Sequence, residues 1–168
     1  MSDLQKLLSL LFLRSAPQDL SYSSRLLLQL VAAYLFSGIV VLQTTLTPDD
    51  MFAGIFLGFF VQYIFTYLVL KALGRGPRFL QTLCAILGVG ILFNLLSWPV
   101  FSVLSDASIS EASKASMSLM FLMLISWEVL VKAHIFRHAL EMKIFSALVL
   151  SFSLFFISIA LSQLFFPV

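Results

Sequence analysis

Charged residues are scarce in this chain. Asp, Glu, Lys and Arg make up 11% of its 168 residues, whereas a typical soluble domain contains about 25%. Hydrophobic residues make up 61%, and a small soluble domain leaves too much of its surface in water to hide so many. The shortage of charge therefore excludes a soluble globular protein and a disordered chain, and it predicts an integral membrane protein.

Cysteine and clustered basic residues are also lacking. Cys84 is the single cysteine, so the sequence excludes an extracellular scaffold built on disulfides. The net charge is only +2, and the basic residues are dispersed along the chain instead of forming one patch. The absence of such a patch excludes nucleic acid as a partner.

Five apolar segments are long enough to cross a bilayer, which requires a helix of about 20 residues. They lack the alternation of polar and apolar residues that marks a membrane β-barrel. We therefore predict an all-α, polytopic membrane protein with a bundle of five transmembrane helices. Pro99 is expected to end the third span, and residues 105–116 are expected to form a polar loop. The predicted spans are Leu26–Leu46, Met51–Leu70, Phe79–Trp98, Met117–Phe136 and Ile144–Phe165.

The basic residues lie almost entirely on one side of this topology. Lys114 falls on the side opposite to the N-terminus, and the other nine Lys and Arg fall on the N-terminal side. The positive-inside rule therefore predicts a cytoplasmic N-terminus and an exterior C-terminus. The nine residues are Lys6, Arg14, Arg25, Lys71, Arg75, Arg78, Lys132, Arg137 and Lys143.

Residues 1–25 form a predicted cytoplasmic segment, and residues 26–168 form the transmembrane domain. Ser2 and Gln5 have the spacing of a capping box, which marks a helix start. Leucines follow at helical spacing and predict a short amphipathic helix on the membrane surface. This helix either anchors the first span, which is the interpretation that we favour, or senses lipid composition or curvature. The leucines are Leu4, Leu7, Leu8 and Leu11.

Small and polar residues indicate where the spans pack, because helices in lipid associate through close packing and hydrogen bonds. Such residues recur on one face of the second span and on one face of the fifth. These faces are predicted to point into the bundle. The second span carries Gly54, Gly58, Gln62 and Thr66, and the fifth carries Ala147, Ser151, Ser158 and Ser162.

The third span has small residues on two faces, one around Gly88 and one around Gly90 and Asn94. A helix with two such faces is expected to lie between neighbours, so we predict the third span at the centre of the bundle. Gly54-x-x-x-Gly58 also fits a contact between two copies of the chain. Packing within the chain is the interpretation that we favour.

Glu128 is a charged residue inside the fourth span, where a bare charge costs at least about 2–3 kcal/mol at full depth. Lys132 follows four residues later, in the favourable order for an ion pair on a helix. One hypothesis is a proton or cation site that Asn94 or Gln62 completes. The alternative, which we favour, is a Glu–Lys pair near the cytoplasmic interface with its charged ends directed to water.

A metal site and an active site have little support in the sequence. His134, His138 and Glu141 share a helical face and could contribute zinc ligands, but no H-E-x-x-H pattern or second cluster completes the set. No serine lies in a G-x-S-x-G turn. We therefore predict no metal, no cofactor and no enzymatic activity.

One group of residues lies mostly near the C-terminus and has the pattern of a known family. It comprises Trp127, the stretch 132–140, Lys143, the apolar Ile144–Phe166, and Asp19-Leu20 before the first span. With these residues the chain resembles the Yip1 family of small multi-pass membrane proteins, as a compact bacterial member without the long N-terminal region and the full Asp-Leu-Tyr-Gly-Pro motif of eukaryotic members. The resemblance implies five spans, an exterior C-terminus and a bacterial cytoplasmic (inner) membrane location.

Two hypotheses about function follow. The first, which we favour, is a non-catalytic scaffold or accessory protein that acts through helix packing and membrane-surface contact, with the bilayer and other membrane proteins or itself as partners. It predicts sensitivity to bulky residues at Gly54, Gly58 or Gly88. The second is a small transporter or channel subunit, in which Glu128→Gln abolishes activity and leaves the fold intact.

Overall fold

The computed structural model describes residues 2–43 and 48–166, and the part of the chain that it describes is helical, without strands. Five of its helices are long and apolar enough to cross a membrane, which confirms the predicted fold class. The predicted end of the first span at Leu46 lies outside the described residues. The helices are α1 (Asp3–Leu11), α2 (Ser24–Leu42), α3 (Pro48–Ala72), α4 (Phe79–Ser105), α5 (Glu111–Leu140) and α6 (Ile144–Phe165), with single 3-10 turns at Pro17–Asp19 and Gly76–Arg78.

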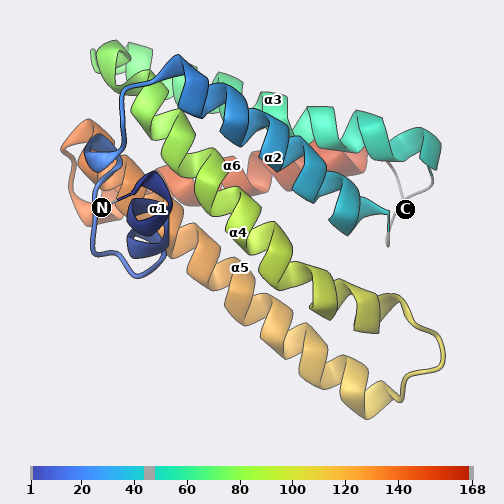
Figure 1. The fold of residues 1–168 in the computed structure, drawn as a ribbon. Coiled ribbons are helices and arrows are strands. Elements are labelled where there is room, and N and C mark those ends of the chain that lie inside the picture. The colour runs from blue at the N-terminus through green and yellow to red at the C-terminus, as the bar shows by residue number, and fades with distance from the viewer. Residues whose placement is uncertain (1, 44–47, 167–168) are drawn as a thin grey trace.

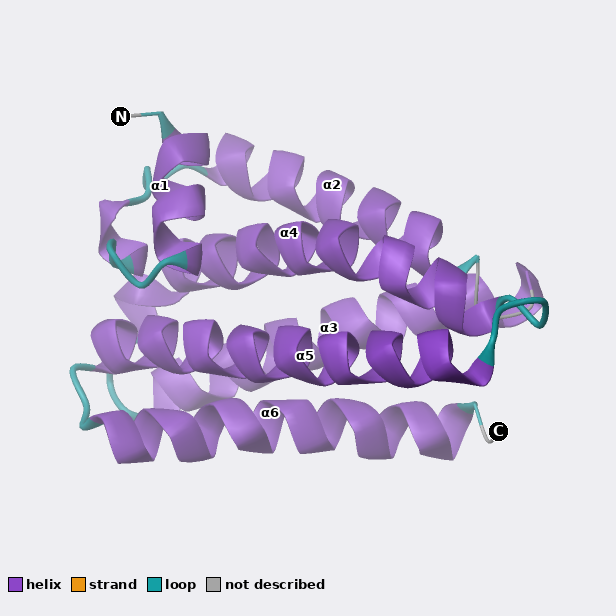
Figure 2. Cartoon of the chain, turned by 90° about the horizontal axis from the view of Figure 1, so that it is seen from below, coloured by secondary structure: helices purple, strands orange, loops and turns teal. Residues whose placement is uncertain are grey.

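Helix α4 lies at the centre of the bundle and contacts α1, α2, α3 and α5 (Figures 1 and 2). Every residue from Thr82 to Gly90 is buried, so this stretch of α4 has neighbours on all sides. Helix α6 packs against α5 and α3. The prediction that the third span is central is confirmed.

The two ends of the bundle differ. We call the end that carries α1 and the α3–α4 and α5–α6 connections the basic end, and the opposite end the C-terminal end. In Figure 1, α2 and α3 diverge from α4 and α5 toward the C-terminal end. Burial follows this shape, because the buried residues of α5 all lie between Val129 and Leu140, and those of α6 end at Leu154. The bundle is therefore closely packed at its basic end and more open at its C-terminal end.

Several helices extend beyond the predicted spans, and the largest differences are on either side of the predicted polar loop. Helix α4 continues through Pro99 to Ser105, because helices in membranes tolerate proline when neighbouring groups satisfy the freed backbone. Helix α5 begins at Glu111, where the Ser110 hydroxyl accepts a hydrogen bond from the backbone N–H of Ser113. The polar loop is therefore shorter than the predicted 105–116.

The N-terminal helix α1 packs against α4 and α5. Its predicted capping box is confirmed: the Ser2 hydroxyl accepts from the Gln5 N–H, and the Gln5 side chain accepts from the Ser2 N–H. Leu7, Leu10 and Leu11 are buried, so the apolar face of α1 covers protein. Of the other predicted leucines, Leu4 and Leu8 remain exposed.

Trp127 and Gly88 hold α1 in place. The Trp127 indole donates from Nε1 to the Leu11 carbonyl oxygen at 2.9 Å, and its ring contacts Phe12 and Phe93. A Cβ atom added at Gly88 would lie 2.5 Å from the Leu7 side chain. Only a glycine at this position lets α1 approach α4 so closely.

Glu141 joins two connections at the basic end. Its carboxylate pairs with Arg75 and, at 2.5 Å, with Arg78, and Arg78 also donates to the Ala139 carbonyl oxygen at the end of α5. The hydrogen bond from Arg78 and the charge of Arg75 lower the pKa of Glu141 below its ordinary value, although partial desolvation opposes them. The α3–α4 connection is thereby tied to the end of α5.

This ion pair predicts a specific response to acid. A carboxylate whose pKa is lowered by folding stabilises the protein above the ordinary pKa of glutamate, and that contribution is lost as the pH falls through the lowered pKa. We therefore expect the unfolding temperature to fall more steeply between pH 7 and about pH 3 in the wild type than in Glu141→Gln. Thermal unfolding in detergent across this range measures the difference, and equal slopes would contradict the prediction.

Candidate functional site

The Glu128–Lys132 ion pair lies in the middle part of α5. The two side chains meet within α5, with Lys132 Nζ 2.6 Å from Glu128 Oε1. Because α5 continues to Leu140, Glu128 lies about 18 Å from the end of the helix, at 1.5 Å per residue. The helix therefore extends past Phe136, where the fourth span was predicted to end, and the position of the pair near the cytoplasmic interface stays a prediction.

The pair is partly buried. The side chain of Lys132 is 14% exposed and that of Glu128 is 29% exposed. Closer to the basic end of α5, Ile135, Phe136 and Ala139 are fully buried, so α5 is more closely packed there than at the ion pair.

Tyr34 and Gln62 form a second polar pair close by. The amide Nε2 of Gln62 donates to the Tyr34 hydroxyl oxygen at 2.5 Å. Two glycines leave room for the tyrosine: a Cβ at Gly90 would lie 3.0 Å from the Tyr34 ring, and one at Gly58 would lie 3.6 Å from its hydroxyl. The small-residue faces of α3 and α4 thus receive the one tyrosine of α2.

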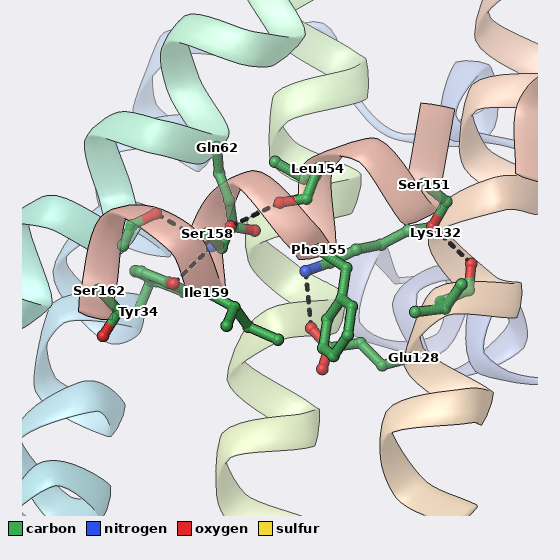
Figure 3. A pocket seen from close by; sticks show the side chains of 12 residues that line it. Tyr34, Gln62, Glu128, Lys132, Ser151, Leu154, Phe155, Ser158, Ile159 and Ser162 are labelled. Carbon is green, nitrogen blue, oxygen red and sulfur yellow. Dashed lines mark hydrogen bonds and ion pairs between the residues drawn. The ribbon is translucent and has the colours of Figure 1, made fainter. Parts of the chain in front are cut away.

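A cavity of about 280 Å³ lies between these two pairs, with α6 along one side (Figure 3). It extends along α6 from Ser151 to Ser162, a distance of about 16 Å at the rise of an α-helix. Its lining contains aliphatic and aromatic side chains as well as polar ones. The lining residues are Tyr34, Gly58, Gln62, Glu128, Val129, Lys132, Ser151, Leu154, Phe155, Ser158, Ile159 and Ser162.

The serines of α6 give this cavity a hydroxyl-bearing wall. Ser151 donates to the Val129 carbonyl oxygen of α5 at 2.7 Å, and Ser158 donates to the Leu154 carbonyl oxygen of its own helix at 2.8 Å. Each hydroxyl that donates to a carbonyl still has its oxygen lone pairs. The wall can therefore accept hydrogen bonds from a polar group in the cavity.

The structure brings together three of the four residues predicted for a polar site. Gln62, Glu128 and Lys132 line the same cavity. Asn94 does not: its amide donates to the Ser37 hydroxyl at 3.0 Å, and it lines a separate cavity of about 190 Å³ with Gly54. Asn94 therefore joins α4 to α2 and does not complete the site around Glu128.

Tyr34 was not predicted as a site residue, and the α6 serines were predicted only to form a packing face. Tyrosine in membrane proteins is enriched at the interfaces, so a tyrosine ten residues into a span could have indicated a polar contact inside the bundle. The facing glycines could not be assigned to it from sequence.

The histidines predicted as possible zinc ligands make separate contacts. His134 Nε2 lies 2.9 Å from the Ser15 carbonyl oxygen, and the His134 and His138 rings lie 4.4 Å apart between centroids. Glu141 is engaged by the two arginines described above. Among the described residues, no group of three His, Cys, Asp or Glu side chains is arranged to hold a metal ion.

Comparisons of the chain with protein-family models, with curated proteins and with solved structures give no match. The resemblance to the Yip1 family stays a prediction.

Proposed function

We propose that this multi-pass membrane protein binds a small polar ligand in the cavity beside Glu128 and Lys132, as a small transporter or channel subunit. The observation that carries the proposal is the make-up of this cavity, which brings an ion pair, an amide and several hydroxyls together between helices that are apolar enough to span a membrane. Such groups are expensive to place within a bilayer, and they mark ligand and ion routes in membrane proteins.

The proposed entry to the cavity is from the C-terminal end. The lining continues along α6 as far as Ser162, close to the end of that helix at Phe165. The basic end, in contrast, is closed by the buried side chains around α4 and by α1. With the orientation that the positive-inside rule gives, the cavity faces the exterior and the closed end faces the cytoplasm.

Thiol labelling tests this proposal. We expect Ser158→Cys to react with a membrane-impermeant thiol reagent added from the C-terminal side of oriented vesicles, because a polar cavity admits water and a thiolate forms only where water reaches the sulfur. Serine and cysteine are similar in size, so the fold should tolerate the change. Mass spectrometry of the labelled protein gives the modified fraction.

Two controls make the result specific. Ser153→Cys places a thiol on the same helix at a residue that does not line the cavity, and we expect it to react at least tenfold more slowly. The native Cys84 is buried, so the unmodified chain provides the blank. Equal, slow reaction of Ser158→Cys and Ser153→Cys would refute an accessible polar cavity.

A scaffold is the second candidate, and one observation favours it. In the C-terminal half of α4 and the N-terminal half of α5, Leu95, Trp98, Leu119 and Met123 are exposed, while Phe101 and Phe121 hold the two helices together with ring centroids 4.8 Å apart. A partner helix could pack on this pair of helices within the membrane. A failure of the labelling experiment would favour this candidate.

A further inference from the structure

We propose that the ligand of this cavity is a zwitterion, a group that carries an ammonium for Glu128 and an anion for Lys132. This inference rests on the proposed function and names the ligand class of the same site. Two sources supply such a group: the headgroup of a zwitterionic phospholipid and a small soluble zwitterion such as an amino acid. The argument uses the unpaired acceptors, the donors and the net charge of the cavity.

The acceptors are arranged for an ammonium. Gln62 is 6% exposed, and its Oε1 is buried without a hydrogen-bond partner among the described residues. A buried amide oxygen without a partner is unfavourable, so a turn of the Gln62 amide that brings this oxygen to a donor in the cavity is favoured. Glu128 meets Lys132 through Oε1, which leaves Oε2 of the carboxylate for a second donor. An ammonium supplies three N–H donors and fits this set.

The donor of the site is Lys132. Its ammonium has three N–H groups and, within the described residues, forms an ion pair with Glu128. The remaining N–H groups can donate to a phosphate or a carboxylate, and such charge-assisted hydrogen bonds are stronger than neutral ones. Lys132 lies one helical turn from Glu128 on the same face of α5, so a ligand with its two charges a few ångströms apart can contact both.

The net charge of the cavity separates a zwitterion from a simple ion. Among its lining residues only Glu128 and Lys132 carry a formal charge, so the charges of the site cancel. A single cation entering the cavity is attracted by one of these residues and repelled by the other, and the same holds for an anion. A zwitterion can satisfy both residues without leaving either charge uncompensated.

The size and shape of the site admit both sources. A volume of about 280 Å³ corresponds to about nine water molecules in the liquid, which is enough for a compact headgroup or a small amino acid. The divergence of α2 and α3 from α4 and α5 at the C-terminal end leaves apolar surface beside the site (Figure 1), where the tails of a lipid could lie. The experiment therefore includes a lipid arm and a soluble arm.

Thermal unfolding of the full-length protein in detergent tests the proposal. The lipid arm compares phosphatidylethanolamine with the anionic phosphatidylglycerol, and the soluble arm compares glycine with acetate and with methylammonium, each of which carries one of the two charges. We expect phosphatidylethanolamine or glycine to raise the midpoint by about 4 °C or more at saturation. A response in the lipid arm alone identifies a headgroup, and a response to glycine alone identifies a soluble ligand.

Two variants assign the effect to the site. The double variant Glu128→Gln/Lys132→Gln removes both charges and should lose the shift, while the matched pair Glu111→Gln/Lys114→Gln on the same helix lies outside the cavity and should keep it. Gln62→Met leaves the ion pair in place and should reduce the ligand-induced rise of the unfolding midpoint. This variant still tests the site if the double variant does not fold.

Three results would overturn the inference. They are equal shifts from the single-charge probes, no shift from either zwitterion, and a shift that persists in both Glu128→Gln/Lys132→Gln and Gln62→Met. If any of them occurs while Ser158→Cys is still labelled, the accessible cavity stands and only its ligand class is wrong. If Ser158→Cys is not labelled, the proposed function fails first.

Discussion

Replacing Glu128 with glutamine is expected to lower the free energy of unfolding by about 3 kcal/mol, which revises the expectation from sequence that this change leaves the fold of a transporter intact. The change leaves the Lys132 ammonium, which is 14% exposed, without its carboxylate. Breaking one partner of a buried ion pair costs about 3–5 kcal/mol in general, and insertion scales give about 2.5–3.5 kcal/mol for a lysine at the centre of a membrane-spanning helix. The open side of the cavity keeps the expected value at the lower end of the first range. Thermal or chemical unfolding in detergent measures it.

A double variant and a control on the same helix show whether this loss of stability comes from the unpaired lysine. Glu128→Gln/Lys132→Gln should recover most of it, because neither amide needs a counterion. Glu111→Gln removes a partner of Lys114 at the exposed end of α5, where the two atoms lie 3.6 Å apart, and surface pairs of this kind contribute about 0–1 kcal/mol. If Glu128→Gln lowers the free energy of unfolding by no more than Glu111→Gln does, the charge of Lys132 does not need Glu128 as its counterion, and the prediction is wrong.

Gly88→Val should displace α1 from the bundle, with a loss of about 3 kcal/mol in the free energy of unfolding. Even a methyl group at this position would lie 2.5 Å from Leu7 Cδ2 and 2.9 Å from Leu7 Cδ1. Overpacking a core costs about 1–3 kcal/mol, and the burial of the Leu7 side chain is lost in addition. Thermal unfolding gives the loss of stability, and limited proteolysis shows whether the N-terminal segment becomes accessible.

A compensating change distinguishes this clash from a general defect. Leu7→Ala combined with Gly88→Val should recover stability relative to Gly88→Val alone, because the smaller side chain frees the space that the valine occupies. Gly76→Ala, at a glycine with nothing within 4 Å of its Cβ position, should change stability by less than about 0.5 kcal/mol. An N-terminal segment that stays protected in Gly88→Val would contradict the close contact between α1 and α4.

The five spans could be predicted because each is a continuous apolar run, but their ends could not. Residues 111–116 and the Arg137-His138 pair are helical although they are mostly polar, since a capped helix continues beyond its apolar run when its backbone is satisfied. A hydropathy pattern locates the apolar core of a span and says little about how far the helix extends beyond it.

The candidate site was predictable only where its residues share a helix. The Glu128–Lys132 pair follows from a spacing of four residues, and the inward faces of α3 and α6 follow from periodicity. The pairing of Gln62 with Tyr34, and of Asn94 with Ser37, depends on how α2, α3 and α4 cross. Where these helices cross, Gly58 of α3 and Gly90 of α4 lie against Tyr34 of α2. A single sequence does not show which residues of different helices face one another.

The contact between Trp127 and Leu11 also orders the events of biosynthesis. These residues are 116 positions apart, so at about 5–20 residues per second the ribosome adds Trp127 roughly 6–23 s after Leu11. During that interval the apolar face of α1, with Leu7, Leu10 and Leu11, has no complete α4–α5 surface to cover. Amphipathic helices bind membrane surfaces. We therefore expect the same leucines to serve first as a lipid contact of the nascent chain and later as part of the core.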